Sequence, residues 1–445
     1  METDIKDAIK NFSKQFLQKI EDKKIHIISH FDTDGITSAA ILTKTLERQG
    51  KQFSTKIIKQ LSPEEINLFP RDRVIILLDL GSGSLEELTK LKNTVFIIDH
   101  HEIGDNPKNL VILNPHLSKY KEKLCAAELT YLVSKEISEE NKNLAHLAIL
   151  GAVGDTLEKD INKIRNEIIK DADVKVKKGV LIYPSTRPLD KALEYCSRPF
   201  IPGVTGNPRG TYELLTEAGI NRVGRSYKAL IDLNEQEMKN LATAITLRLS
   251  EKEASEHIGN LYLIKLFNKI EDAREVSAII NACSRMDQPE IAVLTCLGNN
   301  NARKKAERIY VKYRQHIISG LKYIESNGNI QGKEYVIINA KDNVKDTIIG
   351  TLASILSFSS IYKKGTVIVA MAYNEDKIKV SARMSGRNSG SSRNLRELMN
   401  SITHSLGVGE SGGHQHAAGC TIKIEHEERF IDLVKRKLDI EMVRV

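Results

Sequence analysis

Between residues 24 and 154 the chain repeats one unit, in which a short apolar run is followed by a polar or glycine break and then by a helical pattern. The runs are rich in β-branched residues, too short for helices and too continuous for half-exposed strands, as is typical of buried parallel strands. They cover residues 25–29, 74–78, 95–98 and 110–113. Residues 36–48 and 84–91 have helical spacing between them. This alternation predicts a doubly wound α/β domain with a parallel sheet.

Carboxylates and imidazoles follow these apolar runs at the point where each run ends. In a doubly wound sheet, ligands bind outside the carboxyl ends of the strands. A single Asp-x-Asp-Gly would as readily only cap the next helix, but the full set at consecutive strand ends favours a metal site. The set consists of His30, Asp32, Asp34, Asp79, Asp99, His100, His101 and, after a later helical segment, Asp155.

The spacing of Asp32 and Asp34 predicts a site for two ions. Residues i and i+2 of an extended chain point to the same side, with Cα atoms ~6.5–7 Å apart. This separation suits two carboxylates that each hold one of two cations ~3.5–4 Å apart. Asp79 is placed to bridge both ions, and His30 with Asp32 can complete the first. The residues expected to complete the second are Asp34, His100 and Asp155.

The mixture of imidazole and carboxylate ligands indicates the kind of metal. It favours Mn²⁺, Co²⁺, Fe²⁺ or Zn²⁺ over Ca²⁺ and Mg²⁺, which prefer oxygen alone. We expect two Mn²⁺ ions, with Mg²⁺ or Co²⁺ as the alternatives. Asp99 is predicted to orient the adjacent imidazoles rather than to bind metal. His101 points away from His100 along an extended chain and is left to contact a substrate phosphate.

A second candidate site lies near the C-terminus. Adjacent glycines permit close backbone approach and φ > 0, so that exposed N–H groups can bind an anion, with histidines as further donors. Upstream, Arg383 and Arg387, together with Arg393 and Arg396, lie in a Ser/Gly-rich loop suited to bidentate phosphate contacts. Alone, such glycines would more often form only a tight turn. The segment contains Gly412, Gly413, His414 and His416.

The sequence divides into three predicted regions. Residues 1–195 form the α/β domain with the candidate metal site, residues 196–325 a mainly helical insertion that ends in a basic amphipathic helix over 301–325, and residues 326–445 a smaller C-terminal α/β domain. We expect helices across 159–178 and a mainly helical segment over 211–297. Residues 183–209 hold five of the ten prolines and are predicted to be a connector or an ordered loop.

The composition of the chain indicates the charge of its partners and the compartment in which it works. The 66 Lys and Arg against 58 Asp and Glu give a net charge of +8, which favours anionic partners. The five cysteines are scattered without a C-x-x-C pair, which indicates a reducing compartment, most simply the cytoplasm, and argues against a zinc ribbon or disulfide framework. No run reaches the ~18 apolar residues of a membrane span, and the N-terminus lacks the apolar core of a signal peptide. We therefore expect no membrane association.

These segments resemble the motifs of the DHH phosphoesterase superfamily. The four N-terminal motifs are matched by residues 30–35 (HFDTDG), Asp79, residues 99–101 (DHH) and residues 151–155 (GAVGD). Residues 412–419 (GGHQHAAG) resemble the motif of the superfamily's C-terminal substrate-binding domain. Within the superfamily, the chain is most similar to the archaeal RecJ-like nucleases, which residues 199–206 (PFIPGVTG) also resemble. These are relatives of bacterial RecJ and of an inactivated subunit of the eukaryotic replicative helicase.

The resemblance implies roles for individual residues. One Mn²⁺ would be held by His30, Asp32 and Asp79, and the other by Asp34, Asp79, His100 and Asp155, with His101 on the scissile phosphate. Arg383 and the Gly-Gly-His segment would hold the phosphates and base of a terminal nucleotide, which makes cleavage exonucleolytic. The sequence around Asp155 departs from the usual bacterial form, and no oligonucleotide-binding barrel fits after Gly419. Rules of substrate and polarity learned on bacterial RecJ therefore need not transfer.

Three functional hypotheses stay open. The first is an exonuclease of replication or repair that releases mononucleotides from single-stranded DNA or RNA, favoured by the charge, the basic helix and the middle insertion. The second is a phosphoesterase of small molecules or short oligonucleotides, although such relatives usually lack a middle domain of this size. The third is a replisome scaffold, disfavoured because every expected ligand is present. Replisome or helicase proteins are the expected partners of the middle domain. Cleavage polarity, DNA or RNA preference and oligomeric state are left open.

Overall fold

A five-stranded parallel sheet forms the base of the N-terminal unit. The computed structural model describes residues 4–104, 106–120, 122–196, 199, 201–249, 257–359, 361–386, 393–407 and 410–441. Its strand order is β2-β1-β3-β4-β5. The strands are β1 (Ile25–His30), β2 (Phe53–Ile58), β3 (Val74–Leu78), β4 (Val95–Ile98) and β5 (Val111–Leu113). The predicted doubly wound domain is confirmed, including strands at all four predicted apolar runs. The edge strand β2, whose sequence is more polar, was not predicted.

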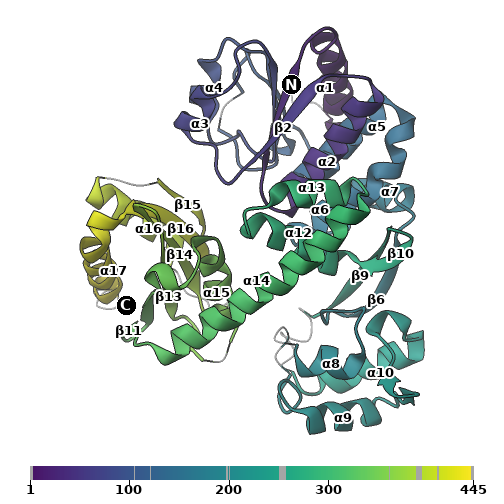
Figure 1. Cartoon of the computed structure of the whole chain (residues 1–445), viewed down its shortest axis with the longest axis vertical. Helices are drawn as coiled ribbons and strands as arrows, with labels where there is room; N and C mark the ends of the chain where they lie inside the picture. Colours follow the sequence, from purple (N-terminus) through teal and green to yellow (C-terminus); the bar gives the residue numbers. More distant parts are fainter. Residues whose placement is uncertain are drawn as a thin grey trace. The chain divides into compact units, whose positions relative to one another are not determined.

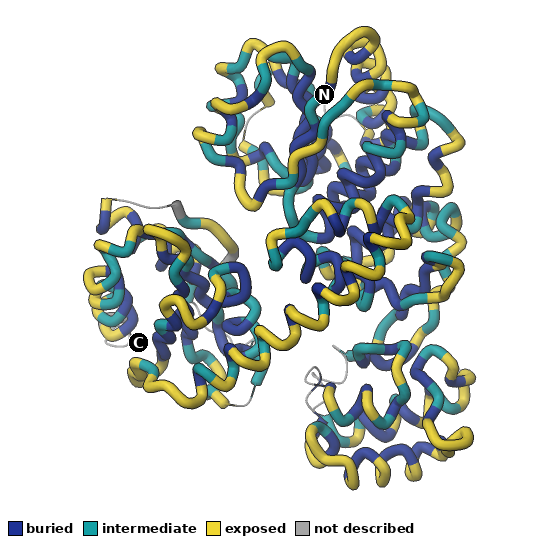
Figure 2. Tube along the Cα trace, in the orientation of Figure 1, coloured by how far each residue is buried: buried dark blue, intermediate teal, exposed yellow. Residues whose placement is uncertain are grey.

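Alternate side chains of the central strands enter two different cores. Ile27 and Ile76 pack with α1 (Ile5–Lys19) and α2 (Thr33–Arg48), whereas Ile28, on the opposite face, packs with the short helices. Those short helices are α3 (Pro63–Asn67) and α4 (Leu85–Thr89). Figure 1 shows α3 and α4 on one side of the sheet and α1, α2 and α5 on the other, and Figure 2 shows the central strands buried between them. The carboxyl ends of the strands are thereby left as one open edge.

Further helices extend the α1 and α2 layer. They are α5 (Ala126–Ile137), α6 (Ala145–Gly154), α7 (Lys163–Asp171), α12 (Ala273–Arg285) and α13 (Pro289–Cys296), with 3₁₀ turns η1 (Pro115–Leu117) and η2 (Glu139–Leu144). Both α5 and α6 pack on α2, and α12 packs on α6. Helix α2 is therefore enclosed, which brings its first turn against the ends of α6 and the start of α5.

The prediction of helices across 159–178 was wrong at residues 175–178, which belong to a strand, and the segment 211–297, expected to be mainly helical, also contains strands. After α7, β6 (Lys175–Val180) pairs antiparallel with β9 (Ile258–Leu266), which forms a hairpin with β10 (Lys269–Asp272). The outer part of β6 is exposed and rich in lysine, so it lacks the apolar run that marks a buried strand. Its partner lies about 80 residues later in the chain, and local periodicity carries no signal of such pairing.

The middle region has a hydrophobic core of its own and is mainly helical, as predicted. Its elements are α8 (Leu189–Glu194), α9 (Pro208–Glu217), α10 (Glu235–Thr246), the two short strands β7 (Arg222–Val223) and β8 (Ser226–Tyr227), and η3 (Leu230–Asp232). The described residues of the proline-rich stretch include α8 and the start of α9.

The chain divides into two compact units, residues 1–310 and 311–445, within the long helix α14 (Asn300–Ser326). The basic helix predicted over 301–325 matches α14 closely. The three-region division of the chain, with boundaries at 195 and 325, stays a prediction.

The C-terminal unit contains a mixed sheet of order β11-β12-β13-β14-β16-β15. Its strands are β11 (Ile330–Gln331), β12 (Tyr335–Asn339), β13 (Val367–Asn374), β14 (Lys377–Met384), β15 (Glu410–His414) and β16 (Ala417–Lys423). Its helices are α15 (Asp346–Phe358), α16 (Leu395–Leu406) and α17 (Glu427–Glu441), with η4 (Lys341–Asn343) and η5 (Ile424–His426). Val380 of β14 packs with α16 and α17, whereas the neighbouring Ser381 faces α15. The described part of the chain holds no helix with the length and apolarity that a membrane crossing requires.

Candidate metal centre

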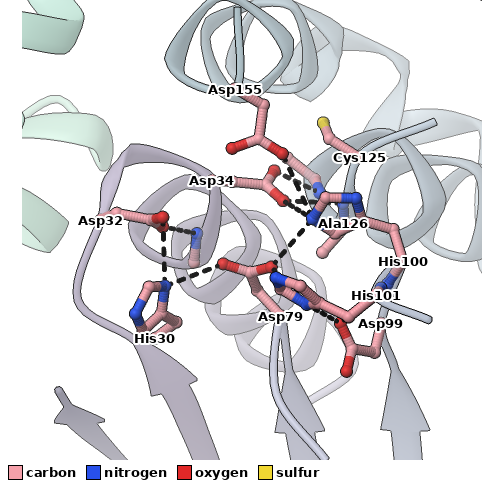
Figure 3. Close-up of polar contacts among 12 residues, drawn as sticks. His30, Asp32, Asp34, Asp79, Asp99, His100, His101, Cys125, Ala126 and Asp155 are labelled. Atoms are coloured by element: carbon pink, nitrogen blue, oxygen red, sulfur yellow. Dashed lines mark hydrogen bonds and ion pairs between the residues drawn. The ribbon is translucent and has the colours of Figure 1, made fainter. Parts of the chain in front are cut away.

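The predicted ligands of both ions meet at the open edge of the N-terminal sheet (Figure 3). Their ligand atoms form three overlapping groups, within each of which all atoms lie within 4.8 Å of one another. The groups are His30, Asp32 and Asp79; Asp34, His100 and Asp155; and Asp79, His100 and His101. The structure thus brings together residues that are up to 125 positions apart in the chain, from His30 to Asp155.

The turn from β1 into α2 places His30 and Asp32. Oδ1 of Asp32 caps α2 by accepting the N–H of Gly35 at 3.0 Å, and Oδ2 lies 3.1 Å from Nδ1 of His30. The helix-capping and ligand interpretations of Asp32 are therefore compatible, because each uses a different oxygen. A Cβ on Gly35 would collide with the carbonyl oxygen of His30. Only glycine allows the chain to turn this tightly from strand to helix.

Asp79 lies between the two ion groups at the end of β3. Its Oδ2 is 3.1 Å from Nδ1 of His30, and its Oδ1 is 3.3 Å from Nε2 of His100. Oδ1 is buried and accepts no hydrogen bond from the described residues. A buried carboxylate oxygen without a donor is costly unless a cation satisfies it. The backbone of Asp79 is also left-handed, with φ of 57°, which is uncommon outside glycine and is concentrated at functional sites.

Asp34 is fully buried and is held by the first turn of α5. Its Oδ2 accepts the N–H of Ala126 and its Oδ1 that of Ala127, both at 2.8 Å. Each oxygen keeps a second lone pair, so these bonds orient the carboxylate without exhausting its capacity to bind a metal. Burial and then the charge of Asp79 raise the pKa of Asp34 to about 7.

His100 and Asp155 complete the second group. Nε2 of His100 is 3.2 Å from Oδ2 of Asp155, which follows the last residue of α6, and 3.8 Å from Oδ2 of Asp34. Burial, followed by the charge of Asp34, raises the pKa of Asp155 to about 9. Burial would lower the pKa of His100, but its close approach to Asp79 and the charges of Asp34, Asp79 and Asp155 outweigh that effect and raise the pKa to about 10. Without a metal, this group therefore holds protons that a cation would displace.

Two glycines let α6 approach α2 closely enough to bring Asp155 into the site. A Cβ at Gly151 would lie 2.8 Å from Oδ1 of Asp34, and a Cβ at Gly154 would lie 2.6 Å from Cβ of Thr33. The glycines of the 151–155 segment thus have a packing role that the sequence did not reveal. The hydroxyl of Thr33, which lies between Asp32 and Asp34 in the chain, also contacts Ser277 of α12 at 3.0 Å.

His101 is oriented by Asp99. Oδ1 of Asp99 accepts from Nδ1 of His101 at 2.7 Å and from the backbone N–H of His100 at 2.8 Å, and its Oδ2 accepts from the N–H of Ser82 at 2.9 Å. The side chain of His101 is 53% exposed, whereas Asp99 is buried. The bond to Asp99 raises the pKa of His101. The arrangement suits the predicted orienting role of Asp99 and the predicted phosphate contact of His101, and both roles stay predictions.

The donor set fits a pair of divalent cations. Two groups that combine carboxylate oxygens with imidazole nitrogens share Asp79, whose buried Oδ1 lacks a hydrogen-bond donor among the described residues. Burial would lower the pKa of His30, but Asp32 and Asp79 hold it well above its ordinary value. The surplus of carboxylates over cationic side chains in the groups is what two bound cations would neutralise.

The second predicted site lies in the C-terminal unit. Gly412 and Gly413 belong to β15 and pair with β16, and the φ of 130° at Gly413 is a conformation that favours glycine. Nε of Arg383 on β14 donates to Oγ of Ser354 at 3.0 Å. Nδ1 of His416 is buried and has no hydrogen-bond partner among the described residues. Arg387 and the side chain of His414 lie outside the described residues. A role for these residues in binding substrate stays a prediction.

Three domain models match the chain in succession. The N-terminal domain of the DHH family matches residues 24–152, the DHH-CID domain residues 182–261, and the DHHA1 domain residues 332–439. A relative among curated proteins is an uncharacterised protein of Methanocaldococcus jannaschii, which is 27% identical over 427 residues, or 92% of each chain.

Solved structures share the fold. The RecJ of Thermus thermophilus in complex with Mn²⁺ has a TM-score of 0.60 at 16% identity over 97% of this chain, which spans only 54% of that protein. An exonuclease RecJ bound to manganese has a TM-score of 0.60 at 17% identity, covering 98% of this chain and 94% of its own. CDC45 from Entamoeba histolytica has a TM-score of 0.66 at 12% identity, covering 97% and 98%.

Proposed function

Because this chain belongs to the DHH family of phosphoesterases, with its DHH, DHH-CID and DHHA1 domains in order, we propose that it is a two-metal exonuclease on single-stranded nucleic acid. It would remove mononucleotides from an end of DNA or RNA during replication or repair. The observation that carries the proposal is Asp79, whose two oxygens lie 3.1 Å from His30 on one side and 3.3 Å from His100 on the other. A carboxylate placed to bridge two mixed ligand groups fits a site that holds two neighbouring ions for phosphoryl transfer.

Each proposed ion has its own residues. The first is assigned to His30, Asp32 and Asp79, and the second to Asp34, Asp79, His100 and Asp155. When bound, such ions supply an acidified water as nucleophile and neutralise charge on the phosphoryl oxygens. Mn²⁺ is the proposed metal, because imidazole and carboxylate ligands together suit it.

The residues around the ions have positioning and proton roles in this proposal. Asp99 holds the proton of His101 on Nδ1, so that Nε2 is directed to the scissile phosphate as a hydrogen-bond donor when the ring is charged. The bond to Asp99 raises the pKa of His101, which favours that charged form. The backbone N–H groups of Ala126 and Ala127 donate to the Asp34 carboxylate and fix its orientation.

Several features support a polymeric substrate. Helix α14 carries exposed basic side chains, namely those of Lys304, Lys305, Arg308 and Lys312. The net charge of +8 also favours binding of a polyanion. In the proposal, the terminal nucleotide binds at Arg383, Arg387, Gly412, Gly413, His414 and His416.

The direct test is digestion of end-labelled single strands, blocked at either end, with Mn²⁺ or Mg²⁺. We expect mononucleotides from the wild type and no product from Asp79→Asn. A matched control is Asp287→Asn, because Asp287 has the same left-handed backbone, with φ of 58°, in an exposed position. Equal digestion by Asp79→Asn and the wild type would refute the metal assignment, and the blocked ends identify the polarity.

A replisome scaffold is the second candidate, favoured by the TM-score of 0.66 to CDC45 over nearly the whole of both chains. It predicts binding without hydrolysis of polymers, dinucleotides or small phosphate esters at any metal concentration. Hydrolysis of small esters alone would instead identify a small-molecule phosphoesterase.

A further inference from the structure

Arg165 of α7 is a buried cation whose every N–H group has an acceptor. The residue is 1% exposed, and none of the residues that accept its hydrogen bonds belongs to the candidate metal groups. Its Nε and Nη2 form a two-pronged pair with the carboxylate of Glu128, both at 2.7 Å. The remaining three donors bind the backbone carbonyls of Lys123, Leu157 and Asp160. An arginine uses all five donors of its planar fork only where the surrounding chain is built to receive them.

The Glu128 side of this pair organises the start of α5. Oε2 of Glu128 also accepts the N–H of Cys125, the residue that caps α5, at 3.0 Å. The next two N–H groups, of Ala126 and Ala127, are those that hold Asp34. The Arg165–Glu128 pair therefore lies directly behind the part of the helix that orients one proposed ligand of the second ion.

The carbonyl side of Arg165 organises the segment that follows another ligand. Leu157 and Asp160, whose carbonyls bind Nη1, come two and five residues after Asp155. The carbonyl of Lys123, just before α5, binds both Nη2 of Arg165 and the side-chain amide of Asn162, each at 3.1 Å. One guanidinium thus connects the segment before α5 with the segment after Asp155.

We propose that Arg165 is a positioning residue for the second metal ion. Through these bonds it fixes the separation of the Asp34 and Asp155 carboxylates, which come from different elements. Two residues of the first ion, His30 and Asp32, are placed instead by the β1–α2 turn at Gly35, and the third, Asp79, by the end of β3, so Arg165 acts selectively on the second ion. The inference rests on the proposed function, because it assumes that Asp34, His100 and Asp155 bind a metal.

The test uses titration calorimetry on the full chain to measure how many Mn²⁺ ions bind and how tightly each one binds. Arg165→Lys keeps the charge but cannot reach five acceptors. We expect wild type to bind two ions, and the variant to bind one with near-normal affinity and the other about 10- to 100-fold more weakly, as for other residues that orient metal ligands. Hydrolysis by the variant should fall at low Mn²⁺ and recover at high Mn²⁺, with little change in the KM for the nucleic acid.

A matched control links the same two helices at their other ends. Asp171 of α7 accepts from the hydroxyl of Tyr131 at 2.9 Å and from Nζ of Lys135 at 2.5 Å, both on α5. Asp171→Asn should lower stability without changing either Mn²⁺ affinity. If Arg165→Lys does not fold, Glu128→Gln, which keeps the shape of the side chain, serves as the second variant.

The outcomes separate the two claims. A wild type that binds fewer than two ions overturns the proposed function. A wild type that binds two ions, together with Arg165→Lys or Glu128→Gln that bind both with unchanged affinity, overturns only the role of Arg165. Equal weakening of both ions, or equal weakening by Asp171→Asn, also overturns the selective role.

Discussion

Gly151 of α6 lies against Asp34 of α2, so that a Cβ at position 151 would be 2.8 Å from Oδ1 of the carboxylate and 2.5 Å from Cβ of Ala127. Gly151→Ala should therefore push α6 away and destabilise the fold by about 1–3 kcal/mol, the usual effect of overpacking. It should also weaken Mn²⁺ binding. Denaturant unfolding and metal titration measure the two effects. Gly83→Ala, where a Cβ meets nothing within 4 Å, is the control and should change stability by less than about 0.5 kcal/mol.

Asp99→Asn should separate the binding of metal from the reaction. The amide cannot hold the proton of His101 on Nδ1 as the carboxylate does, so the orientation and the raised pKa of His101 are both lost. We expect both ions to bind normally and kcat to fall by about 10²- to 10⁴-fold, the range for a positioned proton donor. A kcat unchanged from wild type would show that His101 does not act on the reacting phosphate.

Metal binding should strengthen as pH rises. Without metal, the pKa of Asp34 is raised to about 7, that of Asp155 to about 9 and that of His100 to about 10, and each proton must leave before the atom binds a cation. Raised pKa values stabilise the metal-free fold at low pH, and this stabilisation is lost as pH rises through them. The increase in Tm caused by Mn²⁺ should therefore be larger at pH 8 than at pH 6. If the increase in Tm caused by Mn²⁺ were the same at both pH values, these groups would not be losing protons when the metal binds.

Charge reversal on α14 should affect long substrates selectively. Lys305→Glu with Arg308→Glu is expected to weaken binding of a long single strand and to reduce the slope of log K against log salt by about 1 for each phosphate that the helix no longer neutralises. Hydrolysis of a dinucleotide should not change. Lys10→Glu, an exposed position on α1, is the control. Equal salt slopes for the wild type and the α14 variant would exclude this helix from the path of the polymer.

The parallel sheet and the ligand cluster were predictable from sequence for the same reason. Short buried strands leave continuous apolar runs, and the carboxyl ends of parallel strands share one edge, so Asp32, Asp79 and His100 had to lie near one another. The pairing of β6 with β9 was not predictable, because it joins segments far apart and one of them is lysine-rich.

The contacts that position the metal-ligand candidates were not predicted from the sequence. Glu128 is an isolated charge in an otherwise apolar helical segment, which is a signal of a buried ion pair, but nothing local indicates that its partner is Arg165. The N–H groups that hold Asp34 belong to alanines, whose side chains carry no chemistry. The contribution of Gly151 is visible only once α6 and α2 are seen to touch.

The left-handed backbone at Asp79 limits what can replace this residue during divergence. Asn and Gly adopt that conformation at little cost, whereas β-branched residues do not. A lineage that lost hydrolysis but kept the fold would therefore be expected to carry Asn or Gly at this position before any other residue. The amino acid found there can help to sort family members that have retained chemistry from those that retain only the architecture.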